Sequence, residues 1–286
     1  MKLIKYFFQF LFIIFFFSLF KIFGFKISSK IGGKLFEIIG PIFRSKKLIH
    51  TNIKKAFPKN NSVEIKKLTK LMWNNYGRVF AEYMFIRDFR FEKIDSKIEI
   101  IGQEILDEIK KSNKPVVFIS GHFSNFELMA MQIEKAGIKL SAIYRPLNNI
   151  FLNRIMEKIR KKYICKNQIK KGIAGTRELI KFQRNNYSIA LMIDQRVSEG
   201  EKVNFFNQEA YTTTIPAQLA KKFDMPIVPI FIERVNATNF KIKISKPINF
   251  LKSNSIKDIT SKLNVIIEEM ILKNPTQWIW SHNRWK

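Results

Sequence analysis

The residues with the clearest chemical potential are a histidine and a glutamate five positions apart, His122 and Glu127. They lie in residues 119–127, which read ISGHFSNFE and end an apolar run that begins at Pro115. A neutral histidine near its normal pKa can remove the proton of a hydroxyl group. A carboxylate on the other ring nitrogen would fix the tautomer and stabilise the imidazolium. We therefore predict His122 as a general base oriented by Glu127, with an acceptor hydroxyl attacking directly.

Two other interpretations of the same residues must be weighed. A histidine after a strand can serve only to cap the next helix, and the spacing alone is short enough to occur by chance. Of the three histidines, however, His122 alone follows an apolar strand and a glycine. A metal site is not favoured, because the segment lacks the i, i+4 ligand pair of a zinc helix and the only cysteine is Cys165. No metal is therefore expected.

Strand-like and helix-like segments alternate along most of the chain and must position these residues. Strands are predicted over residues 115–120, 139–144, 187–193, 226–233 and 240–245. Helices are predicted over residues 62–87, 124–136, 149–162, 176–185, 213–223 and 255–272. Residues 26–60 are basic and contain Gly32-Gly33 and Gly40-Pro41, which read as breakers. The pattern predicts an α/β fold, with a mixed, largely parallel sheet flanked by helices, over residues 26–286.

The N-terminal segment, residues 1–25, is predicted to be a membrane-anchor helix. Residues 6–20 read YFFQFLFIIFFFSLF and would span about 22 Å as a helix, whereas the apolar core of a bilayer is about 30 Å thick. The segment reaches that length over residues 3–25 if Lys21 snorkels. A cleaved signal peptide and a helix lying in the interface are the alternatives. More lysines follow the segment than precede it, which favours a cytoplasmic main domain.

The formal net charge of +28 suits an anionic partner, which could be nucleic acid, anionic lipid or an acidic protein. No aromatic and basic recognition motif of a nucleic-acid-binding protein occurs, so binding to nucleic acid is not expected. An acidic protein and an anionic lipid remain as candidate partners.

Further short motifs follow GHFSNFE along the chain. They are AIYRPLNN at residues 142–149, KGIAGTR at 171–177, LMIDQ at 191–195, FFN at 205–207, TTT at 212–214, IVPIFIER at 227–234 and PTQWIWSHNRWK at 275–286. Together these motifs resemble those of the lipid A biosynthesis acyltransferases, a branch of the glycerolipid acyltransferase superfamily, and they occur in the family's order from the N-terminal anchor to the last residue. Asn207 departs from the family's usual glycine, which questions the backbone geometry of that loop.

The resemblance implies an enzyme that moves a fatty acyl group, of the lauroyl or myristoyl type, from acyl-acyl carrier protein to a hydroxyl of a lipid A precursor. It implies a bacterial inner-membrane location with a cytoplasmic main domain, and no cofactor beyond the carrier's phosphopantetheine. Arg145 and Arg177 become candidates for binding an oxyanion or a phosphate, and Asp194 for orienting Arg145 or His122. Another lipid acceptor (a glycerophospholipid, an aminolipid or a glycosylated phosphoinositide), a thioesterase, and a non-catalytic protein that binds anionic lipid stay open as alternatives.

Overall fold

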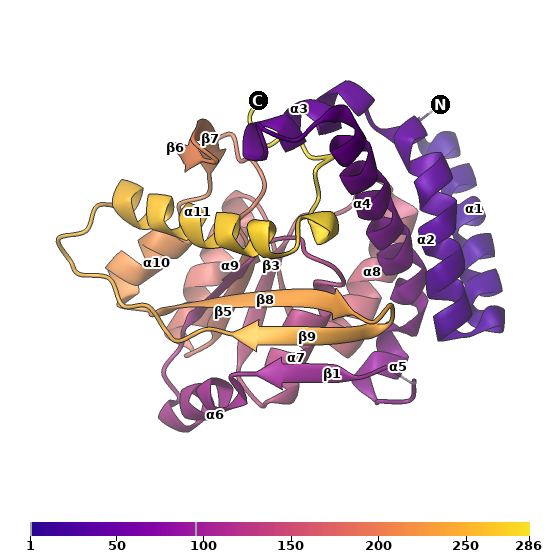
Figure 1. Ribbon diagram of the computed structural model, residues 1–286. Coiled ribbons are helices and arrows are strands. Elements are labelled where there is room, and N and C mark those ends of the chain that lie inside the picture. Colours follow the sequence, from indigo (N-terminus) through magenta and orange to yellow (C-terminus); the bar gives the residue numbers. More distant parts are fainter. Residues whose placement is uncertain (1, 95) are drawn as a thin grey trace.

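The computed structural model describes residues 2–94 and 96–286, and its main element is a mixed sheet (Figure 1). Within the described residues the sheet has seven strands in the order β1-β9-β8-β2-β5-β3-β4. Their bounds are β1 Ile98–Ile101, β2 Val117–Ser120, β3 Leu140–Tyr144, β4 Asn167–Lys170, β5 Ser188–Met192, β8 Ile227–Val235 and β9 Asn239–Ile244. The five strands from β8 to β4 run parallel to one another. The sequence-predicted α/β fold with a largely parallel sheet is therefore confirmed.

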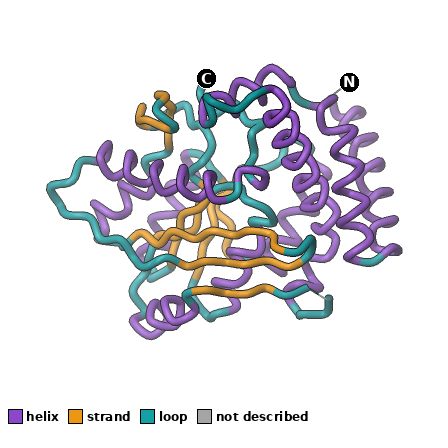
Figure 2. Tube along the Cα trace, viewed as in Figure 1, coloured by secondary structure: helices purple, strands orange, loops and turns teal. Residues whose placement is uncertain are grey.

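Strand β2 lies at the centre of the parallel part, between β8 and β5, and all four of its residues are buried. Its continuous apolar sequence is typical of a strand covered on both faces. Strand β9 pairs antiparallel with β8, and β1 pairs parallel with β9. Figure 2 shows the strands as a central layer with helices around it.

Helices fill the connections between these strands. Helix α7 packs on β3 and β8, α9 on β4 and β5, and α10 on β2. The sequence-predicted helices occur as α4 Ser62–Glu82, α7 Glu127–Lys135, α8 Ile150–Ile159, α9 Ile173–Arg184, α10 Ile215–Phe223 and α11 Ile256–Lys273. Short helical turns continue two of them: η1 Tyr83–Phe85 and α5 Ile86–Arg90 follow α4, and the π-helix η2 Arg160–Ile164 follows α8.

The basic segment after the N-terminal helix is helical, which corrects its interpretation as a broken region. It forms α2 Phe25–Phe43 and α3 Lys46–Ala56. The glycines of α2 face α4 instead of ending the helix: a Cβ on Gly32 would lie 2.4 Å from the carbonyl oxygen of Gly77, and one on Gly40 would lie 2.3 Å from the Trp73 ring. Glycine is therefore required here by close helix packing.

Helix α1, Lys2–Phe23, confirms the predicted N-terminal helix and is apolar and long enough to be a candidate membrane span. It runs beside α2 at one edge of the molecule (Figure 1). Near its start, the amide of Asn149 donates to the Tyr6 carbonyl oxygen at 2.8 Å. Near its end, Lys21 pairs with Asp88 at 2.5 Å. Most of its outward face consists of exposed Phe, Leu and Ile side chains.

Several elements had no sequence prediction. They are β1, β4, α6 Gln103–Ser112, η3 Pro275–Gln277 and a separate hairpin of β6 Glu201–Phe205 and β7 Gln208–Thr212. Asn207, in the hairpin turn, has a φ of 57°. Asparagine tolerates this left-handed conformation better than most residues, so the departure from glycine is compatible with the turn.

Candidate active site

His122 lies beside Asp194 at the carboxyl ends of two neighbouring strands. Strands β2 and β5 pair in parallel with Ser120 opposite Met192, so His122 and Asp194 each stand two residues beyond that pair. The His122 Nδ1 atom is 2.8 Å from Asp194 Oδ1, and the backbone N–H of His122 donates to Asp194 Oδ2 at 2.8 Å. Of the two residues that Asp194 was predicted to orient, Arg145 and His122, the carboxylate contacts His122.

The Asp194 carboxylate is buried, yet it is held in its charged form. Burial raises the pKa of a carboxyl group, but the neighbouring His122 ring and three hydrogen bonds to the carboxylate outweigh it, and the pKa of Asp194 falls to about 2. One of these bonds is donated by the Trp278 indole Nε1–H to Asp194 Oδ2 at 2.8 Å. The ring of Phe126 packs edge-to-face on the His122 imidazole, with centroids 4.9 Å apart. The histidine is therefore fixed on two sides.

Glu127 does not contact His122, which corrects the predicted His–Glu pair. Its Oε1 atom accepts hydrogen bonds from Arg160 Nε at 2.8 Å and Nη2 at 2.5 Å. Glu127 is the first residue of α7, whereas His122 lies in the preceding loop. Helix α7 begins later than expected because Ser124 has a φ of 42°, a strained conformation for a non-glycine residue, and its buried hydroxyl caps nothing. The carboxylate consequently faces η2.

The Glu127–Arg160 ion pair is well shielded from water, since the two side chains are 9% and 14% exposed. Burial opposes the charge on Arg160, but Glu127 more than compensates, so the pKa of the guanidinium is raised. Arg160 begins a π-helix, an irregularity that is common at functional sites.

We expect Glu127→Ala to lower the free energy of unfolding by about 3–5 kcal/mol, because it leaves a buried cation without its carboxylate. The double variant Glu127→Leu/Arg160→Met should recover much of that loss, since it removes both charges. The measurement is the thermal unfolding midpoint of each variant in detergent. If Glu127→Ala instead leaves the midpoint unchanged but removes activity as fully as a His122 variant, then Glu127 acts on His122 after all.

The segment from Gln277 to Arg284 packs against Asp194 and the residues that follow it. Beyond the Trp278 bond to Asp194, the His282 Nε2 atom accepts a hydrogen bond from the backbone N–H of Arg196 at 3.1 Å. Burial lowers the pKa of His282 to about 4, so the ring stays neutral and can accept this bond. The buried Asn52 amide of α3 in turn donates to the carbonyl oxygens of Trp280 and His282. Trp278 and Trp280 are therefore buried side chains of the interior, and Trp278 contacts the carboxylate that holds His122.

The loop of His122 is also anchored on its other side, by Asn125. The Asn125 amide donates to Glu82 Oε2 at 3.2 Å, and Glu82 forms a bidentate ion pair with Arg234, at 2.5 and 2.9 Å. The Glu82 side chain has no exposed surface. This buried group connects α4 and β8 to the loop, and it gives the asparagine of GHFSNFE a structural role.

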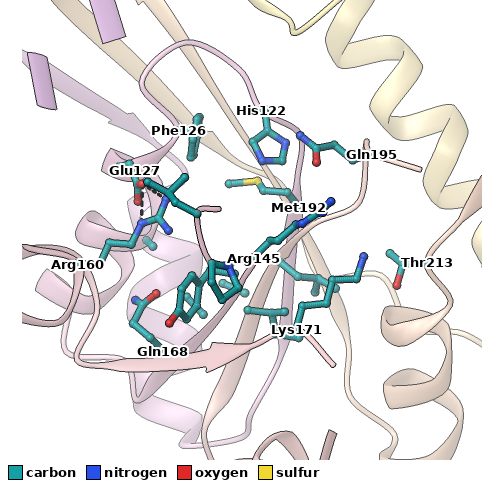
Figure 3. A pocket seen from close by; sticks show the side chains of 18 of the residues that line it. His122, Phe126, Glu127, Arg145, Arg160, Gln168, Lys171, Met192, Gln195 and Thr213 are labelled. Carbon is teal, nitrogen blue, oxygen red and sulfur yellow. Dashed lines mark hydrogen bonds and ion pairs between the residues drawn. The ribbon is translucent and has the colours of Figure 1, made fainter. Parts of the chain in front are cut away.

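A cavity of about 430 Å³ opens in front of His122 (Figure 3). Arg145, Glu127 and Arg160 line it, together with Tyr144, Gln168, Lys171, Met192, Gln195, Arg196 and Thr213. Arg145, a predicted site residue, thus shares a cavity with His122. Arg177 does not line this cavity and lies exposed on α9, while Asp194 is buried behind the histidine.

Sequence reasoning missed Arg160, Asn125, Trp278 and Lys171 as site residues. No local signal marks Arg160, which lies in a helix with several other basic residues. No local signal marks Trp278 either, because its hydrogen bond to Asp194 joins positions 84 residues apart. The recurring motifs already quoted contained Asn125, Lys171 and Trp278, so the motif strings were the available signal.

Comparison with known proteins decides the family. The model of the bacterial lipid A biosynthesis acyltransferases matches residues 1–286, the whole chain. The chain belongs to this family. The lipid A biosynthesis myristoyltransferase of Escherichia coli is 23% identical over 253 residues, covering 87% of this chain and 76% of that protein. The lipid A biosynthesis lauroyltransferase of the same organism is 22% identical over 249 residues, covering 85% of this chain and 79% of that protein.

The lipid A acyltransferase of Haemophilus influenzae is 26% identical over 71% of this chain and 64% of its own length. Among solved structures, a 1-acyl-sn-glycerophosphate acyltransferase of Thermotoga maritima covers 90% of this chain with 13% identity and a TM-score of 0.42. The resemblance seen in the motifs is confirmed, and the protein is an acyltransferase of the lipid A acyltransferase family. The alternative of a non-catalytic lipid-binding protein is thereby set aside.

Proposed function

We propose that this acyltransferase moves a fatty acyl group from acyl-acyl carrier protein to a hydroxyl of a lipid A precursor, with His122 as general base and Asp194 as its orienting carboxylate. The observation that carries the proposal is the pair itself. His122 Nδ1 is engaged by a buried, ionised Asp194, and the ring lies on the wall of a cavity large enough for a substrate group. The other ring nitrogen, Nε2, is then the one left to take a proton.

The reaction follows from that arrangement. His122 Nε2 removes the proton as the acceptor oxygen attacks the thioester carbonyl, so the C–O bond forms and a tetrahedral oxyanion develops. The negative charge of Asp194 stabilises the imidazolium. When the C–S bond breaks, the same imidazolium returns its proton to the departing thiolate. The products are an ester and the free thiol of the carrier, and the proposal needs no resident metal or cofactor.

The basic surface supports an acidic carrier as donor. Exposed cations project from α8 and η2 at helical spacing, namely Arg154, Lys158 and Lys161, and they line a shallow groove with Glu157 and Lys162. Such a row of like charges attracts an acidic protein and speeds its association. The groove lies next to the cavity, because Arg160 and Ile164 of η2 line the cavity wall.

The proposal is tested with purified protein in detergent, an acyl chain on acyl carrier protein, and a lipid A precursor. Formation of the acylated precursor is measured by mass spectrometry, beside a glycerophospholipid acceptor. Transfer to the precursor is the expected result. Transfer only to the glycerophospholipid would overturn the acceptor, and acyl release to water without transfer would make the protein a thioesterase.

We further propose that α1 attaches the enzyme to the bacterial inner membrane, with the main domain on the cytoplasmic side. Its outward face is apolar, and Phe8, Phe12 and Phe15 are exposed. Both ends of α1 also contact the main domain, through Asn149 and Asp88. Because α1 is held along the domain at both ends, we favour a helix that lies in the membrane interface over a helix that crosses the bilayer apart from the domain.

Replacing Phe8, Phe12 and Phe15 by glutamine should move the protein from the membrane pellet towards the soluble fraction. Each exposed phenylalanine contributes roughly 1.5–3 kcal/mol when it enters an apolar phase, so the loss of three is large. The matched control replaces exposed apolar residues elsewhere: Val63, Leu251 and Val265. Fractionation after carbonate washing is the measurement. Equal behaviour of the two triple variants would contradict attachment through α1.

A further inference from the structure

Four cationic side chains of the described structure line the cavity, and two of them have internal partners. Arg160 is engaged with Glu127. The Arg196 side chain donates to the carbonyl oxygen of Lys286 and stacks on the Tyr211 ring. The other two are Arg145 and Lys171, and within residues 2–94 and 96–286 neither side chain makes a hydrogen bond or an ion pair.

Sheet register brings Arg145 and Lys171 together. Strands β3 and β4 run parallel with Tyr144 opposite Lys170, so Arg145 and Lys171 are the first residues beyond two neighbouring strands. The backbone N–H of Lys171 donates to the Tyr144 carbonyl oxygen at 2.9 Å, which ties the two strand ends. Figure 3 shows both side chains extending into the cavity, with the Lys171 amine towards Thr213.

The turn after Lys171 is fixed by glycine. Gly172 has a φ of 132°, and a Cβ on Gly175 would lie 1.8 Å from the Lys170 carbonyl oxygen. Helix α9 can therefore approach the end of β4 only with glycine at position 175. The two glycines of the KGIAGTR motif therefore fix Lys171 at the carboxyl end of β4.

The two cations raise each other's energy. Burial and the neighbouring Arg145 charge both lower the pKa of Lys171, and Glu199 only partly offsets them. Glu127, engaged with Arg160, is the single carboxylate among the described residues that line the cavity. An unneutralised Arg–Lys pair in a cavity is suited to an anion, and guanidinium and ammonium groups together match phosphate oxygens.

We propose that Arg145 and Lys171 form a clamp for a phosphate monoester on the acceptor lipid. The inference rests on the proposed acyl transfer to that lipid. A phosphate monoester carries close to two negative charges at neutral pH, which matches two cations, whereas the phosphodiester of the carrier's phosphopantetheine carries one. The strand order β2-β5-β3-β4 places the backbones of Arg145 and Lys171 two and three strand spacings from that of His122, roughly 10 and 14 Å. The clamp therefore binds away from the reacting hydroxyl and sets its position.

The experiment compares Arg145→Met and Lys171→Met with wild type on the lipid A precursor, before and after its phosphates are removed by phosphatase. On the phosphorylated acceptor each variant should raise KM by about 10- to 100-fold, the range for a charge-assisted hydrogen bond. On the phosphatase-treated acceptor the variants should stay within about 2-fold of wild type, because the phosphate that each side chain would bind is already absent. Arg145→Lys should recover part of the loss. Lys139→Met, at the opposite end of β3, is the matched control.

A second arm replaces acyl-acyl carrier protein by an acyl-pantetheine thioester that has no phosphate. The variants could lose equal activity on both acceptors and recover wild-type activity with this donor. In that case the clamp binds the donor phosphodiester, and the acceptor assignment is overturned. If the losses are equal in all arms, there is no phosphate clamp. Wild-type transfer in the same assay separates these results from failure of the proposed function, which would show as no transfer to either acceptor.

Discussion

Replacing His122 by glutamine should lower kcat for acyl transfer by about 10³- to 10⁴-fold, at the upper end of what a general base contributes. Glutamine approximates the size of the ring and can still hydrogen-bond Asp194, but it cannot accept a proton. Because the change leaves the cavity and its cations in place, KM for the acceptor should move little. Ester formation in the purified system, under saturating donor, is the measurement.

The control for His122 is His50→Gln, on the exposed face of α3. It makes the same chemical change outside the cavity and should retain wild-type kcat. Thermal unfolding of His122→Gln close to that of wild type would show that the loss is chemical. If His122→Gln keeps more than about a tenth of wild-type kcat, His122 is not the base and the proposed mechanism fails.

Asp194→Asn should be nearly as damaging, on the order of 10³- to 10⁴-fold in kcat, by analogy with the aspartate of a serine-protease triad. At Asp194 Oδ2 two donors converge, the His122 backbone N–H and the Trp278 indole N–H. Asparagine must keep its oxygen there, so its NH₂ group faces His122 Nδ1. The ring then takes the tautomer with a proton on Nε2, which cannot serve as a base.

The pH dependence sharpens this expectation. The folded-state pKa of Asp194, about 2, lies below that of an ordinary aspartate, so the carboxylate is charged at all pH values above it. The deficit of Asp194→Asn should therefore have the same size from about pH 5 to pH 9. Its stabilising charge is lost only as the pH falls towards 2. Asp224→Asn, an equal change at an exposed left-handed position, is the control. A deficit under about 10-fold would remove Asp194 from the mechanism.

The fold was predictable because burial on both faces of a parallel sheet leaves continuous apolar runs such as VVFIS. The same apolar runs predict the positions of His122, Arg145 and Asp194, because residues that follow parallel strands lie together at the carboxyl ends of the sheet. Strands β1 and β4 are hard to detect because each has only four residues: IEII in β1 has no buried position, and NQIK in β4 has a single apolar residue. The glycines of α2 misled because their role is contact with α4, a partner that local sequence does not reveal.

The sequence offers two carboxylates for His122, Glu127 and Asp194, and backbone geometry decides between them. Glu127 is five residues from His122, whereas Asp194 is 72 residues away. The positive φ of Ser124 delays the helix and points Glu127 at Arg160. Register between β2 and β5 supplies Asp194 instead. Proximity along the chain was therefore a poorer guide than proximity across the sheet.

The bond from Trp278 to Asp194 has a consequence for how the enzyme becomes competent during synthesis. A ribosome-bound chain that has emerged only as far as β9 contains every strand of the main sheet, His122 and Asp194, but not the indole that holds the carboxylate. The scaffold can therefore assemble before the chemistry is switched on. Because Trp278 is synthesised after all of these strands, we expect acyl transfer to begin only once residues 275–286 have packed against the carboxyl ends of the strands.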